Sequence, residues 1–548
     1  MACSKIFSGD LPELTNEIIQ YFRKDFSTLY SCILINRLWC RLAIPLLWED
    51  PFPKKYLFSK IHPTNYHFIE IYLSKLNEDI KTKLYEYGVN NNLIISNTLL
   101  FNYPSFIKYL NIDKILNSVQ TWVYTVVGKN QELVNLIYGS LLEMFIENEG
   151  NLHSFEVILP ICYDVNYFNK SIDLILQNPN LTHNIRNLTF RIYNYNNQNI
   201  IKLLKFLYSN CNSISSMALD FPNYGDDYSL ISEKCLTQIY ISQNNLKKIS
   251  FGSFVNLYNP FLTLKNSNCS NTLNTIIFYF IDFKNIISIL QEVFDQLNVL
   301  ESIHILYCNS LNSDFVQQII KVNNPFKLRS LFINKILHFE SLQLLLQKFS
   351  DCLENFGFAS MMFNEYNEPK RQLFEFITKY CKNIRYFESG IPDDNIIYLF
   401  IENNQNNINY LTIEANTYNT DYEELSSIVL QNLGQVLPSK LEYLCLSLSF
   451  TISDLEIFLK NSQNTFIKKL LISDIVGRLG KKILFCIKKY IIKRERVKYL
   501  AITNNNNIDN EFLFTLRNEV NEFKLHNIIV KEFHDLHSSP YIFIDNYF

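Results

Sequence analysis

Residues 328–333 read LRSLFI, an instance of the apolar pattern L-x-x-L-x-L in which Ile, Val, Phe or Met can replace leucine. The last two apolar positions alternate with the period of a β-strand, which sends both side chains to one face. The three-residue step before them turns the chain into that strand. The pattern recurs past residue 100, and its clearest copies begin at Ile185, Ile214, Leu246, Leu273, Leu300, Leu328, Leu353, Ile408, Leu441, Ile467, Val497 and Leu525.

Repetition of this unit determines the expected architecture. A poorer copy begins at Ile384, between Leu353 and Ile408. With it included, the copies follow one another at a mean spacing of about 28 residues, which is typical of repeats built from one strand and one helix. The segments between them have helical spacing, as at Ile286, Ile289 and Val293. A single unit cannot bury its own apolar face, so units must stack. The sequence predicts an α/β solenoid with short parallel strands on its concave face and helices on its convex face. A weak copy at Ile107 predicts an irregular cap over residues 101–150.

The first 50 residues have a different pattern. Pro12 fits the first turn of a helix, because proline costs no hydrogen bond there. A break at residues 25–27 separates two apolar sets with helical spacing, which are Leu11, Leu14, Ile18 and Phe22, then Ile35, Trp39, Leu42 and Leu46. Three short helices are expected. So small a module buries too little surface to be stable alone. We expect it to need a neighbour or a partner, with Trp48 closing it against the residues that follow.

Composition and charge narrow the class of protein. Hydrophobic residues make up 48% and charged residues 19%, which favours a folded chain. The net charge of −3 argues against binding nucleic acid through overall charge. The twelve cysteines are scattered without a C-x-x-C pair, so we expect buried thiols in a reducing compartment. No segment has the apolar length of a signal peptide core or a membrane span. An intracellular protein, cytoplasmic and/or nuclear, with no membrane partner is expected.

The N-terminal stretch resembles an F-box, and the order of the two patterns resembles that of F-box proteins with C-terminal leucine-rich repeats. This resemblance implies an α/β fold in which a three-helix F-box (residues 1–50) and a connector (51–100) precede a leucine-rich-repeat solenoid (101–548). Individual repeats are degenerate. Cys308 and Asn416 are the best matches to the buried Cys or Asn that follows the core in that family.

The resemblance also implies a function and partners. Members of the family are substrate receptors of SCF-type ubiquitin ligases, in which the F-box binds a Skp-type adaptor and, through it, cullin and RING subunits. The matching adaptor-binding positions here are Leu11, Pro12, Ile18, Leu29, Ile35 and Trp39. The alternative for Ile35 and Trp39 is that they form the internal core of the module.

An unknown target protein would bind to the repeats and be directed to ubiquitin-dependent degradation. By strand alternation, the residues expected on the concave face include Arg191, Asp220, Tyr279, His304, Asn334, Glu414 and Lys531. Their mixed chemistry suits a protein or peptide better than a polyanion such as nucleic acid. For each of them a solvated surface role is the alternative. A non-proteolytic binding scaffold is the alternative function.

The sequence predicts no catalytic residue, cofactor or metal site, and so no enzyme. Known zinc motifs combine histidine with cysteine or carboxylate ligands at helix spacing. This pattern is missing around His526, His534 and His537. A basic stretch from Lys481 to Lys498 is interleaved with apolar residues at helical spacing. It is either the solvent side of a convex-face helix or a patch for nuclear localisation or an acidic partner.

Overall fold

The computed structural model describes residues 11–23, 25–52, 67–90, 100–148, 152–159, 165–192, 198–221, 226–253, 257–266, 268–334, 338–358, 367–391, 395–415, 422–475, 482–492, 496–504 and 517–547. These residues form two compact units. Unit 1 contains the described residues up to Lys248 and a short segment that ends at Thr272. Unit 2 contains the other described residues from Ile249 onward.

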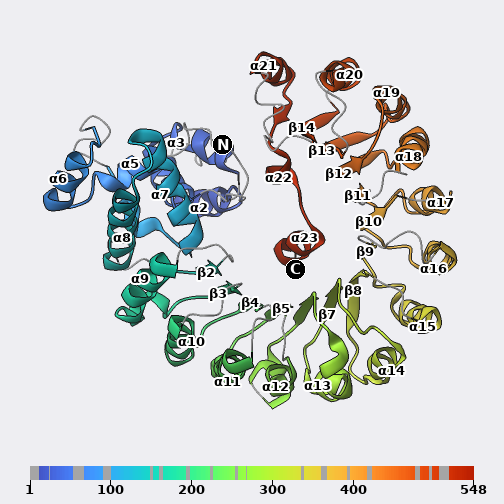
Figure 1. Cartoon of the computed structure of the whole chain (residues 1–548), viewed down its shortest axis with the longest axis horizontal. Coiled ribbons are helices and arrows are strands. Elements are labelled where there is room, and N and C mark those ends of the chain that lie inside the picture. Colours follow the sequence, from blue (N-terminus) through green and yellow to red (C-terminus); the bar gives the residue numbers. More distant parts are fainter. Residues whose placement is uncertain are drawn as a thin grey trace. The chain divides into compact units, whose positions relative to one another are not determined.

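The chain is an α/β protein whose described strands are parallel wherever their pairing is defined and follow one another in chain order (Figure 1). In unit 1 each strand pairs with the next. The strands are β1 (Tyr109–Asn111), β2 (Ser154–Leu159), β3 (Asn187–Ile192) and β4 (Ser216–Asp220). The helices around them are α7 (Ile112–Val126), α8 (Gln131–Glu147), α9 (Val165–Leu176), α10 (Gln198–Asn210) and α11 (Asp226–Ser242).

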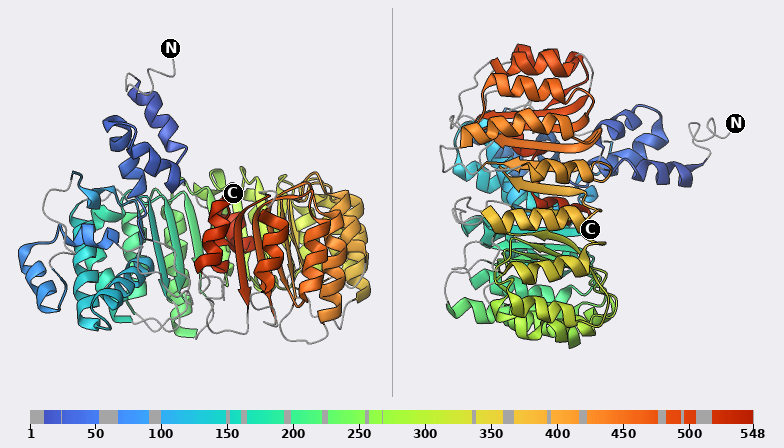
Figure 2. Two further views of the ribbon diagram at one scale, coloured as in Figure 1. Left: turned by 90° about the horizontal axis from the view of Figure 1, so that it is seen from above. Right: turned by 90° about the vertical axis from the view of Figure 1, so that its right-hand side faces the viewer.

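Three short helices begin unit 1: α2 (Pro12–Gln20), α3 (Phe26–Ile33) and α4 (Arg37–Leu47). They stand apart from the strand layer of this unit (Figure 2). Asp25 and Asn36 start α3 and α4, because their side chains accept hydrogen bonds from the backbone N–H groups of Thr28 and Trp39. We call α2–α4 the helical module. Its core is formed by Ile19, Leu29, Cys32, Trp39, Ala43 and Leu46.

Trp48 connects the helical module to the residues that follow it, as the sequence predicts. Its ring lies 5.4 Å from that of Tyr72 in α5 (His67–Leu73) and 4.3 Å from that of Tyr103. The Lys114 ammonium also contacts the Asp50 carboxylate at 2.9 Å. The remaining helix of this region is α6 (Glu78–Glu86).

Unit 2 repeats one strand and one helix many times. Its strands are β5 (Lys248–Gly252), β6 (Thr275–Tyr279), β7 (Ser302–Leu306), β8 (Lys327–Phe332), β9 (Asn355–Gly357), β10 (Tyr386–Gly390), β11 (Tyr410–Glu414), β12 (Lys440–Leu448), β13 (Phe466–Asp474), β14 (Val497–Asn504) and β15 (Ile529–Val530). Between them lie α12 (Tyr258–Thr263), α13 (Leu290–Gln296), α14 (Ser313–Lys321), α15 (Phe339–Phe349), α16 (Asn367–Tyr380), α17 (Ile396–Asn403), α18 (Tyr422–Val436), α19 (Ile452–Asn461), α20 (Lys482–Ile491) and α21 (Arg517–Leu525).

The predicted repeat cores coincide with the strands. In β7, Ile303 and Ile305 alternate along the strand and are buried, as are Leu444 and Leu446 in β12. Alternation places their neighbours on the opposite side, which we call the front face of the unit 2 sheet. Helices α13–α20 lie on the other side (Figure 1). The prediction of short parallel strands with intervening helices is therefore confirmed.

The predicted irregular region near residue 107 differs from the units that follow it, because two helices, α7 and α8, lie between β1 and β2. Ile112, the last apolar position of that copy, starts helix α7 instead of extending strand β1. The cause is the side chain of Asn111, which accepts a hydrogen bond from the Lys114 N–H and so begins the helix. Cys308 and Asn416 are the positions expected to hold the buried Cys or Asn that follows a repeat core. Cys308 is buried. Asn416 lies outside the described residues.

Candidate interaction surfaces

The helical module leaves large apolar side chains uncovered. Tyr21 is 89% exposed, Leu34 78%, Tyr30 67% and Phe26 56%. Phe26 and Tyr30 are four residues apart in α3 and so lie on the same helix face. The adjoining side of α3 contributes Leu29 and Cys32 to the core. An apolar helix that is buried on one side and apolar on its outer side is suited to binding a further protein surface.

The predicted adaptor-binding residues divide between surface and core. Leu11, Pro12 and Ile35 are exposed, and Ile18 is half-buried. Leu29 and Trp39 are buried in the core of the module, which for Trp39 is the alternative left open by the sequence. The outer face formed by Phe26 and Tyr30 was not predicted, although its four-residue spacing was visible in the sequence. Hydrogen bonds from Thr28 and Ser27 lower the pKa of the Asp25 carboxyl that starts this helix.

A row of tyrosines crosses the front face of unit 2. Tyr386, Tyr410 and Tyr443 are register partners on β10, β11 and β12. Their rings stack with centroid separations of 5.9 and 6.0 Å. Burial raises the pKa of the Tyr386 and Tyr443 hydroxyls well above the usual value, so both hydroxyls stay protonated and can donate hydrogen bonds.

The C-terminal segment, residues 533–547, packs on this row. It contains the short helices α22 (Phe533–Leu536) and α23 (Pro540–Tyr547), which lie on the side of the strands opposite α13–α20 (Figure 1). The Phe543 ring lies 5.0 Å from that of Tyr386 and 4.5 Å from that of Tyr410. Tyr541 and Ile544 belong to the same buried cluster, together with Ile277, Leu306, Tyr307 and Phe332 of the sheet.

Hydrogen bonds fix the position of this segment. The Tyr386 hydroxyl donates to the Ser538 carbonyl at 3.2 Å, and the Ser538 N–H donates to the Tyr443 hydroxyl at 3.3 Å. Farther along, the Ser250 hydroxyl donates to the Tyr541 hydroxyl at 3.1 Å. Because both backbone groups of Ser538 bind to the tyrosine row, the flanking side chains have defined positions.

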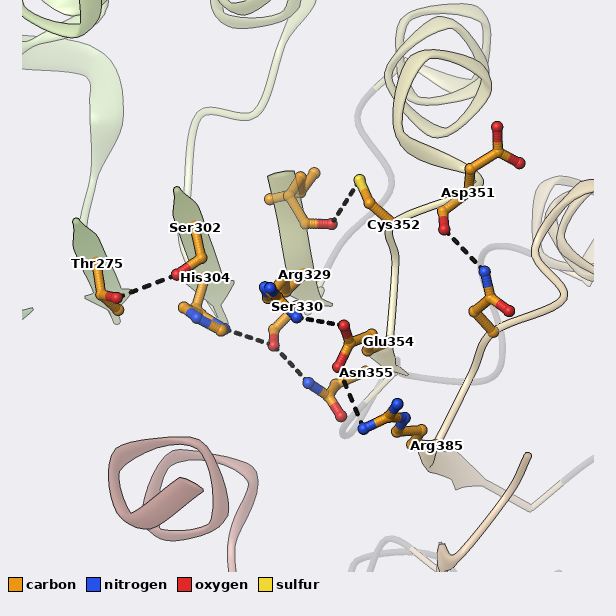
Figure 3. A network of polar contacts seen from close by, with 12 residues as sticks. Thr275, Ser302, His304, Arg329, Ser330, Asp351, Cys352, Glu354, Asn355 and Arg385 are labelled. Atoms are coloured by element: carbon orange, nitrogen blue, oxygen red, sulfur yellow. Dashed lines mark hydrogen bonds and ion pairs between the residues drawn. The ribbon is translucent and has the colours of Figure 1, made fainter. Parts of the chain in front are cut away.

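Polar side chains on the front face of β6–β9 form hydrogen bonds with one another (Figure 3). The His304 Nδ1 and the Ser330 hydroxyl are 2.7 Å apart, and the Asn355 amide donates to the same hydroxyl at 2.8 Å. Thr275 and Ser302 form a further pair at 3.1 Å. Because His304 is fully buried, this network is internal to unit 2 and is not a solvent-facing surface.

The predicted target-binding residues therefore have varied environments. Tyr279 and Glu414 contact the C-terminal segment, since Tyr279 packs 4.5 Å from Tyr541 and the Glu414 carboxylate lies 3.6 Å from the His537 ring. Lys531 is exposed. The others are Arg191, half-buried in β3, Asp220, buried in β4, His304, buried in β7, and Asn334, whose amide donates to the Tyr307 carbonyl.

One group of side chains between the sheet and the C-terminal segment has the donors of a metal site. Glu414, Cys445 and His537 each offer one ligand atom, and these atoms lie within 4.8 Å of one another. Cys445 is fully buried. Burial and the charges of Glu414 and Glu388 raise the pKa of its thiol. Burial and the Glu414 charge raise the pKa of Glu388 to about 8. The sequence did not predict this group, because its members are distant along the chain.

The basic stretch lies partly on α20. Lys488 forms an ion pair with Glu522, and the Lys489 ammonium contacts the Glu456 carboxylate at 2.6 Å. Arg496 is buried, and its guanidinium donates to the Ser462 carbonyl. Lys481 and residues 493–495 lie outside the described part of the chain. These pairings accord with the interpretation of the stretch as the solvent side of a helix.

The sequence matches none of the known protein-family models with which it was compared, and none of the curated proteins. Among the described residues, no helix combines the length and the apolar character that crossing a bilayer demands.

Proposed function

We propose that the chain is the substrate-recognition subunit of an SCF-type E3 ubiquitin ligase. Residues 1–50 act as an F-box that binds a Skp-type adaptor, which connects the chain to cullin and RING subunits. The leucine-rich repeats bind a target protein. Catalysis then results from proximity, because holding the target near a charged conjugating enzyme raises its effective concentration.

The exposed apolar face of the helical module is the observation that carries this proposal. A module of three short helices has a small core, and Phe26, Tyr30 and Leu34 remain more than half exposed outside it. Burial of such side chains is favourable by roughly 1.5–3 kcal/mol each. Large aromatic residues are also the ones most often found as anchors of protein interfaces.

The target would bind to a surface that the chain leaves accessible. Tyr279 and Glu414 on the front face of unit 2 are already in contact with the C-terminal segment. A target that uses this face must therefore displace residues 533–547 or bind on top of them. Lys531, which is exposed beside this segment, is available in either case.

Adaptor binding tests the proposal directly. The full-length chain should bind a purified Skp-type adaptor. The double substitution Phe26→Ala with Tyr30→Ala should weaken binding at least about thirtyfold, since one anchor residue contributes about 2 kcal/mol or more. The pair Leu11→Ala with Pro12→Ala should also weaken it. Phe485→Ala is the matched control, because Phe485 is an equally exposed aromatic residue on α20. No binding by the wild-type chain, or unchanged binding by both double variants, would contradict the proposal.

Reconstitution separates the ligase subunit from the non-proteolytic scaffold. The chain is combined with adaptor, cullin and RING subunits, and ubiquitin transfer is measured to a target captured by the full-length protein. Transfer that is lost with Phe26→Ala and Tyr30→Ala supports the ligase. Stable assembly without transfer supports the scaffold.

A further inference from the structure

Three side chains with metal-binding atoms converge from three separate elements of unit 2. Glu414 ends strand β11, Cys445 lies in the middle of β12, and His537 follows α22. The Cys445 Sγ lies 3.9 Å from the Glu414 Oε1, and the His537 Nε2 lies 3.6 Å from the same oxygen. In a tetrahedral zinc site, bonds of about 2.0–2.3 Å place the ligand atoms about 3.3–3.8 Å apart. The two separations from the Glu414 oxygen are close to this range, and all three ligand atoms lie within 4.8 Å of one another.

The position of each ligand is fixed by the fold. In the sheet, Thr412 is the register partner of Cys445, so Glu414 lies two residues farther along the neighbouring strand and on the same face. His537 is held from both sides. Its ring stacks on Phe533 at 5.6 Å, and the next residue, Ser538, is hydrogen-bonded to the tyrosine row.

The charges around this point also favour a cation. The Glu414 carboxylate, 3.9 Å from the Cys445 Sγ, supplies a negative charge at this point. A thiolate, an imidazole and a carboxylate are ligands that zinc binds readily. A divalent cation would stabilise the thiolate and offset the carboxylate charge, with release of the thiol proton.

We propose that Glu414, Cys445 and His537 bind a divalent cation of the zinc class, which fastens the C-terminal segment to strands β11 and β12. The three ligands leave a fourth coordination position for water or for a group from a partner. In a second group with metal-binding atoms, which lies on and just before α22, the His534 ring is paired with Glu532 at 2.8 Å. This group, Glu532, His534 and Asp535, contains no cysteine and so cannot form a metal–sulfur bond. It therefore serves as an internal control. The site is independent of adaptor binding.

Cobalt substitution in the full-length protein tests the site. Co²⁺ added to chelator-treated protein should give a thiolate-to-cobalt charge-transfer band, which requires a Co–S bond, and Zn²⁺ should remove it by competition. Cys445→Ser should abolish the band. Cys381→Ser and His534→Ala should leave it unchanged, since Cys381 is an equally buried thiol elsewhere in unit 2. Absence of the band in the wild-type protein, or its survival in Cys445→Ser, would overturn the proposal.

Two further variants guard against a folding defect in Cys445→Ser. Glu414→Gln and His537→Gln alter ligands that are partly exposed, so the fold should tolerate them. Each should weaken Zn²⁺ binding at least tenfold, because loss of even an outer partner of a ligand costs about 10–100-fold. In the wild-type protein, Zn²⁺ should slow amide hydrogen exchange in residues 533–547, and this effect should be lost in His537→Gln. Unchanged affinity in both variants would also refute the site.

Discussion

The helical module and the C-terminal segment are both short helical regions rich in large apolar residues, yet their exposures are opposite. Tyr21 in the module is 89% exposed, whereas Tyr541 in the segment is 8% exposed. The difference does not come from residue type. The segment meets a complementary surface within its own unit, the tyrosine row of β10–β12, whereas the outer face of α3 meets no comparable surface within the described residues of unit 1.

This contrast distinguishes two uses of apolar surface. Burial of aromatic residues against a preformed sheet stabilises the folded chain itself. The same residues left exposed on a small module contribute little to its stability and are available to contact another protein. The module can be a docking surface only if this contrast holds. Matched substitutions in the two regions, compared by their effects on stability, test the contrast.

The largest difference is expected between Phe543→Ala and Tyr21→Ala. Phe543 contacts two rings of the tyrosine row, so its removal should cost about 3–5 kcal/mol of the free energy that holds the segment on the sheet. Tyr21→Ala should change stability by less than about 0.5 kcal/mol. Denaturant unfolding and hydrogen exchange of residues 533–547 measure both effects. Comparable losses in the two variants would show that Tyr21 is also part of a packed core, and the contrast would fail.

The sequence predicted the strands well because the strand signal is local. In LESIHI, residues 300–305, the alternation that buries Ile303 and Ile305 spans only a few residues. The three-helix pattern of the module is local in the same sense. The start of α7 at Ile112 was not predicted, because the side chain of Asn111 ended that strand early.

The docking of the C-terminal segment could not be predicted in this way. Tyr541 and Phe543 contact strands far away in the chain, and nothing in residues 540–547 identifies Tyr279 or Tyr386 as their partners. For the same reason, the sequence around the three histidines near the C-terminus did not show the carboxylate and cysteine that complete a metal site. In the folded chain, Glu414 and Cys445 lie beside His537.

The helical module and the sheet of unit 2 also differ in how a carboxylate in each makes stability depend on pH. Burial and the Glu414 charge raise the pKa of Glu388 to about 8, although the hydrogen bond that the Tyr307 hydroxyl donates to it acts in the opposite direction. The folded state therefore binds this proton more tightly than the unfolded state, whose pKa lies near 4.5. The resulting stability is complete below that value and is lost as pH rises toward 8, on the order of a few kcal/mol.

Urea unfolding measured across this pH window tests the effect. Glu388→Gln should flatten the profile, and Glu340→Gln, at an exposed position in α15, should not. The contribution of the Asp25 carboxyl to stability should depend on pH in the opposite direction. Its pKa is lowered in the folded state, so this contribution is lost as pH falls. A profile that is equally steep in Glu388→Gln would exclude this carboxyl as the cause.

The smallest effect concerns how the segment is held. Tyr541→Phe keeps the ring that packs against Tyr279 and removes the hydroxyl that accepts from Ser250. One such hydrogen bond contributes about 0.5–1.5 kcal/mol, well below the cost expected for Phe543→Ala. Combining the variant with Ser250→Ala in a double-mutant cycle isolates this pair from the other contacts of Tyr541. If Tyr541→Phe released the segment as fully as Phe543→Ala does, polar contacts and not ring burial would hold it. The apolar residues of the two regions would then no longer be comparable, because burial of the rings would not be the force that distinguishes them.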